Sequence, residues 1–563
     1  MSIIKAKDLV DSFEEKGFHY TKDLLFNYYI SLITKPFVIL TGISGSGKSK
    51  IAELFAEIIN DTTLKSYELI PVKPNWRDNK GLFGYHNLID NSYYITPMIR
   101  LFLRALHKPN TPFFLILDEM NIAKTEHYFA DYLSLIESRR IEKFTDDIST
   151  DELDLEEIFT YSDDTSLSEA IVLSALDINK LDQMLEIKDY RENRFSKLWQ
   201  KTIFGGKNWT AQYRSELNQG TNRLANRVFE GGNGTYRLKK KDDINPADWE
   251  RIENLKKLYT KTMLKEKVRI VQDNIILHNS DTCLSADGNR SDCRDCAYKN
   301  SEKYKCEKLY NERTEQYLVP PELPIPINVF TVGTVNVDET TYMFSPKVLD
   351  RSNVIEFNEV DFSGIYNLSE NNIDMINTVV NTVIDEEYYF DDDADMPKLV
   401  ITMAGKEKVN KFIEFAPNQF DDLIKIFTIL KRYNLHFGYR VMNEISLYMY
   451  NVENNTSYVN RMNRGMDNQI LQKILPKLYG SYDNIWNPLT EILGVLLIDS
   501  KEIVAENADV LLDKLKEYSN GKINKLALDG TIAEDLFKYP KSAIKIVNML
   551  NDLNNTGFAA FIK

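Results

Sequence analysis

The stretch from Gly42 to Ser49 carries the residues with the clearest chemistry, because three glycines precede a lysine and a serine. Its spacing fits G-x-x-x-x-G-K-S, in which glycines let backbone N–H groups turn toward phosphate oxygens. Lys48 would reach the β- and γ-phosphates, and the Ser49 hydroxyl would bind Mg²⁺. A glycine-rich turn that matches by chance is the alternative. The predicted phosphate-binding residues are Gly42, Ser44, Gly45, Ser46, Gly47, Lys48 and Ser49.

Two carboxylates form the second candidate group. Asp118 and Glu119 close the apolar run that begins at Pro112. In phosphoryl-transfer enzymes, one such acid holds Mg²⁺ and the next polarises the attacking water. Paired acids after a strand are also common as a solvated turn. Their position after a phosphate-binding motif favours Asp118 as a magnesium ligand and Glu119 as the catalytic base.

Strands and helices must place these groups. Phe37 to Leu40 is an apolar run typical of a buried strand, and Ile51 to Ile59 is an amphipathic helix. Further strands are expected over 67–72, 112–119, 328–335 and 353–357, and residues 1–35 read as helical. Beyond residue 407 the pattern is helical throughout, over 407–415, 419–433, 440–451, 466–478, 488–499, 507–518 and 541–553. Strands alternating with helices, followed by an all-helical end, indicate an α/β nucleotide domain with a helical lid.

Length and composition set the outer limits. A chain of 563 residues corresponds to roughly four domain equivalents. Its net charge of −15 argues against extensive coating of nucleic acid, although the charge is unevenly distributed. No apolar run approaches the length of a transmembrane helix, and residues 1–17 lack the apolar core of a signal peptide. A cytoplasmic protein without membrane contact is therefore expected.

The composition changes at Arg140. Residues 141–190 carry 15 acidic and 3 basic side chains, whereas residues 191–270 carry 19 basic and 9 acidic side chains. Aromatic residues lie among the basic ones, a pattern that suits binding of a nucleic-acid backbone with exposed bases. A solvated basic face that balances the acidic segment is the alternative. The aromatic residues are Trp199, Trp209, Tyr213 and Tyr236.

All four cysteines of the chain, Cys283, Cys293, Cys296 and Cys306, lie within one short segment. In a reducing compartment a shared metal is favoured over two disulfides. Four thiolates suit tetrahedral Zn²⁺ in a structural site. Asymmetric spacings of this kind also occur around iron–sulfur clusters, and four unrelated free thiols are the third possibility.

The motifs together resemble those of McrB-type proteins, the AAA+ NTPase motors of McrBC-like restriction systems. The run from Asn27 through the phosphate loop resembles the start of that AAA+ module, and Leu117-Asp-Glu-Met-Asn121 matches the family's Walker B signature. Gly333-Thr-Val-Asn336 stands at the sensor 1 region. The family string Met-Asn-x-x-Asp-Arg-Ser is here Val335-Asn-Val-Asp-Glu-Thr-Thr341, with Glu and Thr in place of Asp and Arg. Further matching segments are Leu349-Asp-Arg351, at the arginine-finger position, and the lid segments 437–444 and 475–480.

The resemblance implies an AAA+ P-loop NTPase fold with a helical lid. It covers roughly residues 1–140 and 320–563, and the stretch between them indicates a large inserted domain. The expected parts are residues 1–140 and 321–400 as the core, 141–320 as an inserted domain with the four-cysteine site, and 401–563 as the lid. It also implies a catalytic set: Glu119 as base, Asn336 to place the water, and Arg351 acting on the nucleotide of a neighbouring subunit.

By the same resemblance, the chain forms a ring, expected to be a homo-hexamer, that hydrolyses ATP or GTP with Mg²⁺. The ring would drive a separately encoded McrC-like nuclease in antiphage DNA restriction, and DNA would be contacted directly or through that partner. One rival is a MoxR-like ATPase that remodels a protein partner. Another is a non-catalytic scaffold that binds nucleotide to assemble, against which the intact Lys48, Asp118 and Glu119 argue.

Overall fold

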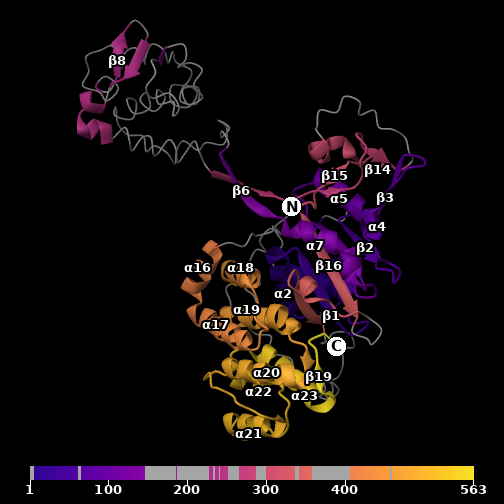
Figure 1. Cartoon of the computed structure of the whole chain (residues 1–563), viewed down its shortest axis with the longest axis vertical. Coiled ribbons are helices and arrows are strands. Elements are labelled where there is room, and N and C mark those ends of the chain that lie inside the picture. Colours follow the sequence, from indigo (N-terminus) through magenta and orange to yellow (C-terminus); the bar gives the residue numbers. More distant parts are fainter. Residues whose placement is uncertain are drawn as a thin grey trace. The chain divides into compact units, whose positions relative to one another are not determined.

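The structure is a computed structural model of the whole chain (Figure 1). Among the residues that it describes, no helix has the length and apolar character needed to cross a membrane. The described residues are 6–18, 20–60, 65–145, 185–186, 227, 229–232, 235–239, 241–250, 266–286, 300–336, 342–357, 406–456 and 460–562.

The chain divides into two compact units. The first combines Met1–Arg140 with Gln272–Lys563, and the second is Ile141–Val271. The second unit thus begins where the composition changes but ends at Val271, whereas the expected insertion extends to residue 320. The difference arises because residues after 271 form small strands that pack beside helix α5 (Pro97–His107) of the first unit.

A five-stranded parallel sheet forms the centre of the first unit, with the strand order β17-β1-β16-β5-β2. Strand β16 lies between β1 and β5, although it follows them in the sequence after a long connection. Its placement brings the end of β16 beside the ends of both motif-bearing strands. The strands are β1 (Phe37–Gly42), β2 (Tyr67–Pro71), β5 (Phe113–Asp118), β16 (Val329–Asn336) and β17 (Asn353–Phe357).

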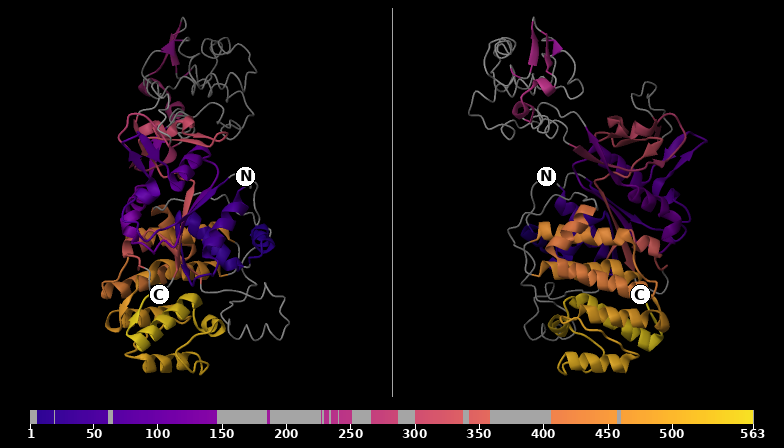
Figure 2. Two further views of the ribbon diagram at one scale, coloured as in Figure 1. Left: turned by 90° about the vertical axis from the view of Figure 1, so that its right-hand side faces the viewer. Right: turned by 60° about the vertical axis from the view of Figure 1, so that its left-hand side comes forward.

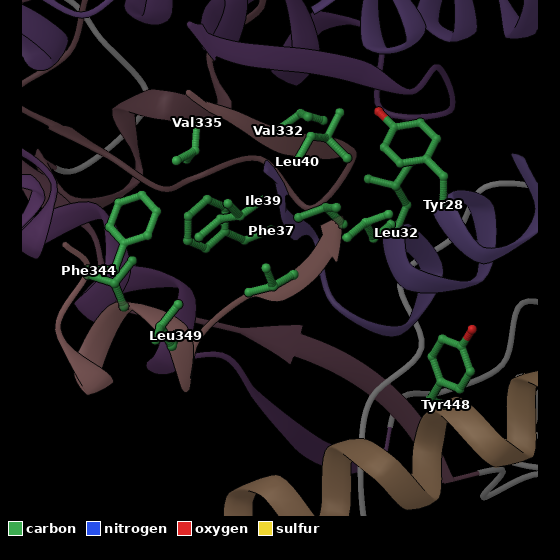
Figure 3. Packing of buried hydrophobic residues seen from close by; sticks show 14 of the residues in the cluster. Tyr28, Leu32, Phe37, Ile39, Leu40, Val332, Val335, Phe344, Leu349 and Tyr448 are labelled. Atoms are coloured by element: carbon green, nitrogen blue, oxygen red, sulfur yellow. The ribbon is translucent and has the colours of Figure 1, made fainter. Parts of the chain in front are cut away.

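The sheet forms the core because its strands are apolar on both faces. Every residue of β1 is buried, as are all residues of β16 except its last. Continuous apolar strands are typical of parallel sheets covered on both sides. Figure 3 shows Leu40 of β1 and Val332 of β16 on the side of Tyr28 and Leu32 of the preceding helix, and Ile39 on the other side of the strand. The mixed α/β character with a parallel sheet agrees with the expected class.

Helices on the sheet begin and end where local sequence dictates. Thr21 caps α2 (Lys22–Thr34), since its hydroxyl accepts a hydrogen bond from the Leu24 amide at 3.3 Å. Thr96 caps α5 in the same way, with proline at the first helical position. Other helices of this part are α1 (Ala6–Glu15), α3 (Lys48–Ile59), α4 (Lys80–Phe83), α6 (Thr125–Tyr128), α7 (Ala130–Glu137) and α14 (Pro346–Leu349).

Small antiparallel strands flank the central sheet. A hairpin of β3 (Tyr85–Asn87) and β4 (Ser92–Tyr94) follows the loop that contains Trp76. The Trp76 ring packs against Tyr128 at 5.3 Å between centroids, so this residue is part of the packing. The strands after residue 271 are β11 (Ile275–Ile276), β12 (Leu284–Ser285), β13 (Tyr310–Asn311), β14 (Gln316–Val319) and β15 (Glu322–Leu323), with short helices η2 (Asn300–Lys305) and η3 (Glu307–Leu309).

The C-terminal part is helical, as expected, and its helices gather into one group, coloured orange to yellow in Figure 2. The predicted helix over 466–478 is instead three pieces, because a π turn and then a 3-10 turn at Pro476 follow α19. The sequence analysis also missed α22. The elements are α16 (Lys406–Phe415), α17 (Pro417–Arg432), α18 (Tyr439–Asn455), α19 (Arg461–Gln469), η5 (Ile470–Ile474), η6 (Leu475–Lys477), β18 (Gly480–Ser481), α20 (Tyr482–Leu496), α21 (Ala508–Tyr518), α22 (Gly530–Leu536), α23 (Pro540–Thr556) and β19 (Phe558–Ala559).

The described residues of the second unit include short strands. β6 (Arg140–Thr145), at the junction, pairs with β10 (Glu266–Val271), and β9 (Thr235–Leu238) pairs with β7 (Leu185–Glu186) and β8 (Phe229–Gly232). The 3-10 turn η1 spans Lys241–Asp243. Tyr236 lies in β9, whereas Trp199, Trp209 and Tyr213 lie outside the described residues. The nucleic-acid interpretation of this segment therefore stays a prediction.

Candidate functional site

The glycine-rich loop connects the end of β1 to the start of α3, and its glycines are needed for geometric reasons. Gly45 and Gly47 have φ angles of +82° and +90°, in the left-handed region that favours glycine. At Gly42 (φ +153°) a Cβ would lie 2.2 Å from the Phe357 carbonyl oxygen of the neighbouring strand β17. The Tyr20 hydroxyl donates a hydrogen bond to the Gly47 carbonyl at 3.1 Å, a contact that the sequence analysis missed.

Lys48 lies inside the curve of this loop. Its ammonium group donates hydrogen bonds to the carbonyl oxygens of Gly42 at 3.0 Å and Ile43 at 2.6 Å. Burial lowers the pKa of Lys48, while Asp118 and Glu119 act to raise it. A buried cation on neutral carbonyl groups gains by exchanging one of them for an anion. Its position suits contact with a phosphate.

Asp118 joins β5 to both neighbouring motifs. The Ser49 hydroxyl donates a hydrogen bond to Asp118 Oδ1 at 2.6 Å, and the Thr334 hydroxyl donates to the same oxygen at 2.7 Å. In P-loop NTPases, the hydroxyl group at the end of the P-loop and a carboxylate at the end of a neighbouring strand together hold Mg²⁺. The residues present therefore fit the predicted magnesium site.

Glu119 and Asn336 meet across the same edge of the sheet. The Asn336 side-chain amide donates a hydrogen bond to Glu119 Oε1 at 2.8 Å. Glu119 has a φ of +52°, which is uncommon for a residue with a side chain. Thr334 holds this conformation, because its hydroxyl accepts from the Glu119 amide at 3.0 Å and its carbonyl accepts from the Met120 amide at 2.9 Å. Backbone strain of this kind clusters at functional sites.

Thr334 is a site residue that the sequence analysis did not single out. It precedes Asn336 by two positions in β16, so both side chains point to the same face of the strand. The two-residue spacing from Asn336 is therefore the feature of the sequence that could have predicted Thr334 as a site residue. We call the cluster of Lys48, Ser49, Asp118, Glu119, Thr334 and Asn336 the P-loop corner.

Arg351 belongs to a second cluster. Its guanidinium group lies 2.6 Å from Glu137 Oε2, at the end of α7, and Arg440 of α18, in the predicted lid, forms an ion pair with the same carboxylate. In the parallel register, Phe357 is the partner of Gly42, whereas Asn353 is the partner of Val38. Arg351 precedes β17, so it lies at the opposite edge of the sheet from the P-loop corner, roughly 15–20 Å away at about 3.3 Å per residue.

Two of the four cysteines lie within the described residues. Cys283 is buried just before β12, and Cys306 is half-buried at the start of η3. Both thus come from elements around β14, which pairs with β12 and β13. Cys293 and Cys296 lie outside the described residues. Within the described part of the chain, no group of three or more His, Cys, Asp or Glu side chains has the geometry of a metal site.

Comparison with protein families matches residues 402–558 to a domain of unknown function (DUF8727). The matched segment covers the helices α16 to α23, the predicted lid. No curated protein matches the chain. The P-loop corner lies outside the matched segment, so the match carries no information on its chemistry.

Proposed function

We propose that the protein is a Mg²⁺-dependent nucleoside triphosphatase that hydrolyses ATP or GTP. The observation that carries the proposal is the P-loop corner, where Ser49 contacts Asp118 and Asn336 contacts Glu119. These groups come from three adjacent parallel strands whose carboxyl ends share one edge of the sheet. Ligands of open α/β sheets bind at that edge.

Each residue has a distinct part in the reaction. The loop amides and Lys48 bind the phosphates, while Ser49 and Asp118 would hold Mg²⁺. A bound magnesium ion supplies positive charge that neutralises the phosphate oxygens. Glu119 accepts a proton from the attacking water or orients it, and the Asn336 amide fixes the Glu119 carboxylate in the required direction.

Arg351 is proposed to act in a ring assembly. Because it lies at the opposite edge of the sheet from its own P-loop corner, a role in hydrolysis requires the nucleotide of a neighbouring chain. A guanidinium group placed there would stabilise charge on the transferring phosphoryl group. The geometry therefore favours an oligomer, and by the resemblance of its motifs we propose a hexamer.

For the biological role, we propose an McrB-type motor that acts in the cytoplasm with a separate McrC-like nuclease in antiphage restriction. The support is the set of motif segments at Leu117–Asn121, Gly333–Asn336 and Leu349–Arg351. The second unit, Ile141–Val271, is the candidate contact for DNA or a partner. The four cysteines are proposed to hold one structural Zn²⁺. The alternative remains a MoxR-like ATPase acting on a protein.

Hydrolysis by the purified chain, measured with and without DNA and together with the products of neighbouring genes, tests this proposal. We expect Mg²⁺-dependent hydrolysis, copurification with a nuclease subunit, and cleavage of DNA that needs hydrolysis. A Lys48→Ala chain is the matched control, since it should retain the partner but lose cleavage. Hydrolysis that responds to a protein partner and not to DNA would support the alternative. Absence of hydrolysis under every condition would contradict the proposal.

A further inference from the structure

A buried group of charged side chains joins the lid to the core. Glu444 of α18 forms an ion pair with Lys473 of η5, with 2.5 Å between Nζ and Oε2, and its other oxygen pairs with Lys35, which follows α2. The Lys473 side chain is 0% exposed, and those of Glu444 and Lys35 are 11% and 9% exposed. We call these three residues the lid–core charge cluster.

The two lysines of this cluster also hold the backbone around Arg351. Lys35 donates a hydrogen bond to the Asp350 carbonyl at 3.3 Å, and Lys473 donates one to the Ser352 carbonyl at 2.6 Å. A third lysine, Lys477 of η6, forms an ion pair with the Asp350 carboxylate. The residues immediately before and after Arg351 are thus tied to lysines from separate elements.

The charge balance of the cluster is unfavourable for stability. Two ammonium groups share one carboxylate, which leaves excess positive charge in the interior. Burial alone would raise the pKa of Glu444, but Lys35 and Lys473 lower it to about 2. Burial lowers the pKa of Lys473 to about 7. Replacing a whole buried ion pair by apolar residues of similar volume is often neutral or stabilising, and Lys35 remains to pair with Glu444 when Lys473 alone is replaced. A stable fold alone therefore does not require Lys473.

The backbone at Lys473 is also unusual. Lys473 lies in the π-helical segment Ile470–Ile474, directly after α19. Short π segments inside helices are rare and occur often at functional sites. The wider turn changes the direction of the side chains that follow it, and here Lys473 faces the Ser352 carbonyl.

We propose that Lys35, Glu444 and Lys473 are positioning residues for Arg351. They fix the backbone on both sides of Arg351 while Glu137 holds its guanidinium group, so the position of the lid sets the direction in which Arg351 meets a neighbouring subunit. The inference rests on the proposed function, because Arg351 has this task only in a hydrolysing assembly.

The test compares Lys473→Met with the wild type in kcat, KM and thermal stability. We expect kcat to fall roughly 10²-fold, as misplacement of catalytic groups by about 1 Å does, with KM nearly unchanged. The melting temperature should equal or exceed that of the wild type, because one lysine and one carboxylate remain. A purely structural role predicts that kcat and melting temperature fall together, and that outcome would overturn the proposal.

Two further variants make the test specific. Combining Lys473→Met with Arg351→Ala should reduce kcat no further than Arg351→Ala alone, because the first change acts through Arg351. Lys545→Met is the matched control: Lys545 also joins the lid to the core, at 2.5 Å from Glu356 of β17, and its loss should leave kcat unchanged. Independent, additive losses from Lys473→Met and Arg351→Ala would contradict the inference.

A less buried variant covers the case in which Lys473→Met does not fold. Lys477→Ala removes the ion pair with Asp350 at a partly exposed position, and it should lower kcat by a smaller factor in the same direction. If the wild type hydrolyses nucleotide and neither variant changes kcat, this inference fails and the proposed function stands. If the wild type does not hydrolyse nucleotide, both fail.

Discussion

The P-loop corner and the Arg351 segment lie at opposite edges of one parallel sheet, and they are held in different ways. In the corner, short hydrogen bonds join neighbouring strand ends, such as those of Ser49 and Thr334 to Asp118. Around Arg351, Lys35, which follows α2, and Lys473 of η5 hold backbone carbonyls in a buried environment. The corner is thus assembled by the sheet itself, whereas the Arg351 segment depends on where the lid lies.

Removal of the Arg351 side chain should give the largest effect on hydrolysis among the changes at the edge of the sheet opposite to the P-loop corner. Arginine fingers contribute roughly 10³–10⁵ in kcat, so Arg351→Ala should abolish most hydrolysis while nucleotide affinity, set by the corner, stays close to that of the wild type. Mixing Arg351→Ala with Lys48→Ala chains should restore part of the activity, because each supplies the group that the other lacks. Titration of the two variants against each other measures this; no recovery at any ratio would count against action between chains.

The Arg351 side of the comparison also predicts how the stabilising effect of Lys473→Met depends on pH. The pKa of Lys473 falls from 10.5 to about 7 on burial, with Glu444 opposing the change and Lys35 and Lys477 adding to it. At pH values between about 7 and 10.5, the unfolded chain binds more protons at Lys473 than the folded chain does. The free energy of unfolding of the wild type therefore rises with pH in this range.

The gain in melting temperature from Lys473→Met should therefore be larger at pH 7 than at pH 9.5. Scanning calorimetry of both proteins at the two pH values measures it. An equal gain at both values would show that burial does not lower the pKa of Lys473, and that the excess positive charge of the cluster does not destabilise the fold.

Loss of the predicted zinc site should have the smallest effect on hydrolysis. Cys293→Ser combined with Cys296→Ser should remove the predicted zinc and unfold the chain locally, because a structural metal contributes folding energy directly. Basal hydrolysis should remain, since the contacts described for the P-loop corner and for Arg351 come from other residues. Elemental analysis and hydrolysis assays measure both effects. A protein purified without chelators that contains neither zinc nor iron would refute the metal site.

Short apolar runs predicted every strand of the central sheet. The structure brings residues of three short motifs together in the P-loop corner, but Thr334 was not predicted there, because only its alternation with Asn336 marks it. Contacts between distant segments were not predictable in this way. The need for glycine at position 42 depends on Phe357 of a strand far along the chain, and the lid–core charge cluster joins Lys35 to Glu444. The pattern over 466–478 predicted one helix, since hydrophobic spacing does not reveal a π turn.

Hydrolysis of nucleotide at the P-loop corner is proposed to depend on Glu119. The most direct test measures nucleotide binding and Mg²⁺-dependent turnover of Glu119→Gln beside the wild type. Glutamine keeps the shape of the side chain but cannot accept the proton, so binding should persist while turnover falls by about 10²–10⁴-fold. Turnover equal to that of the wild type, with nucleotide bound, would contradict the account.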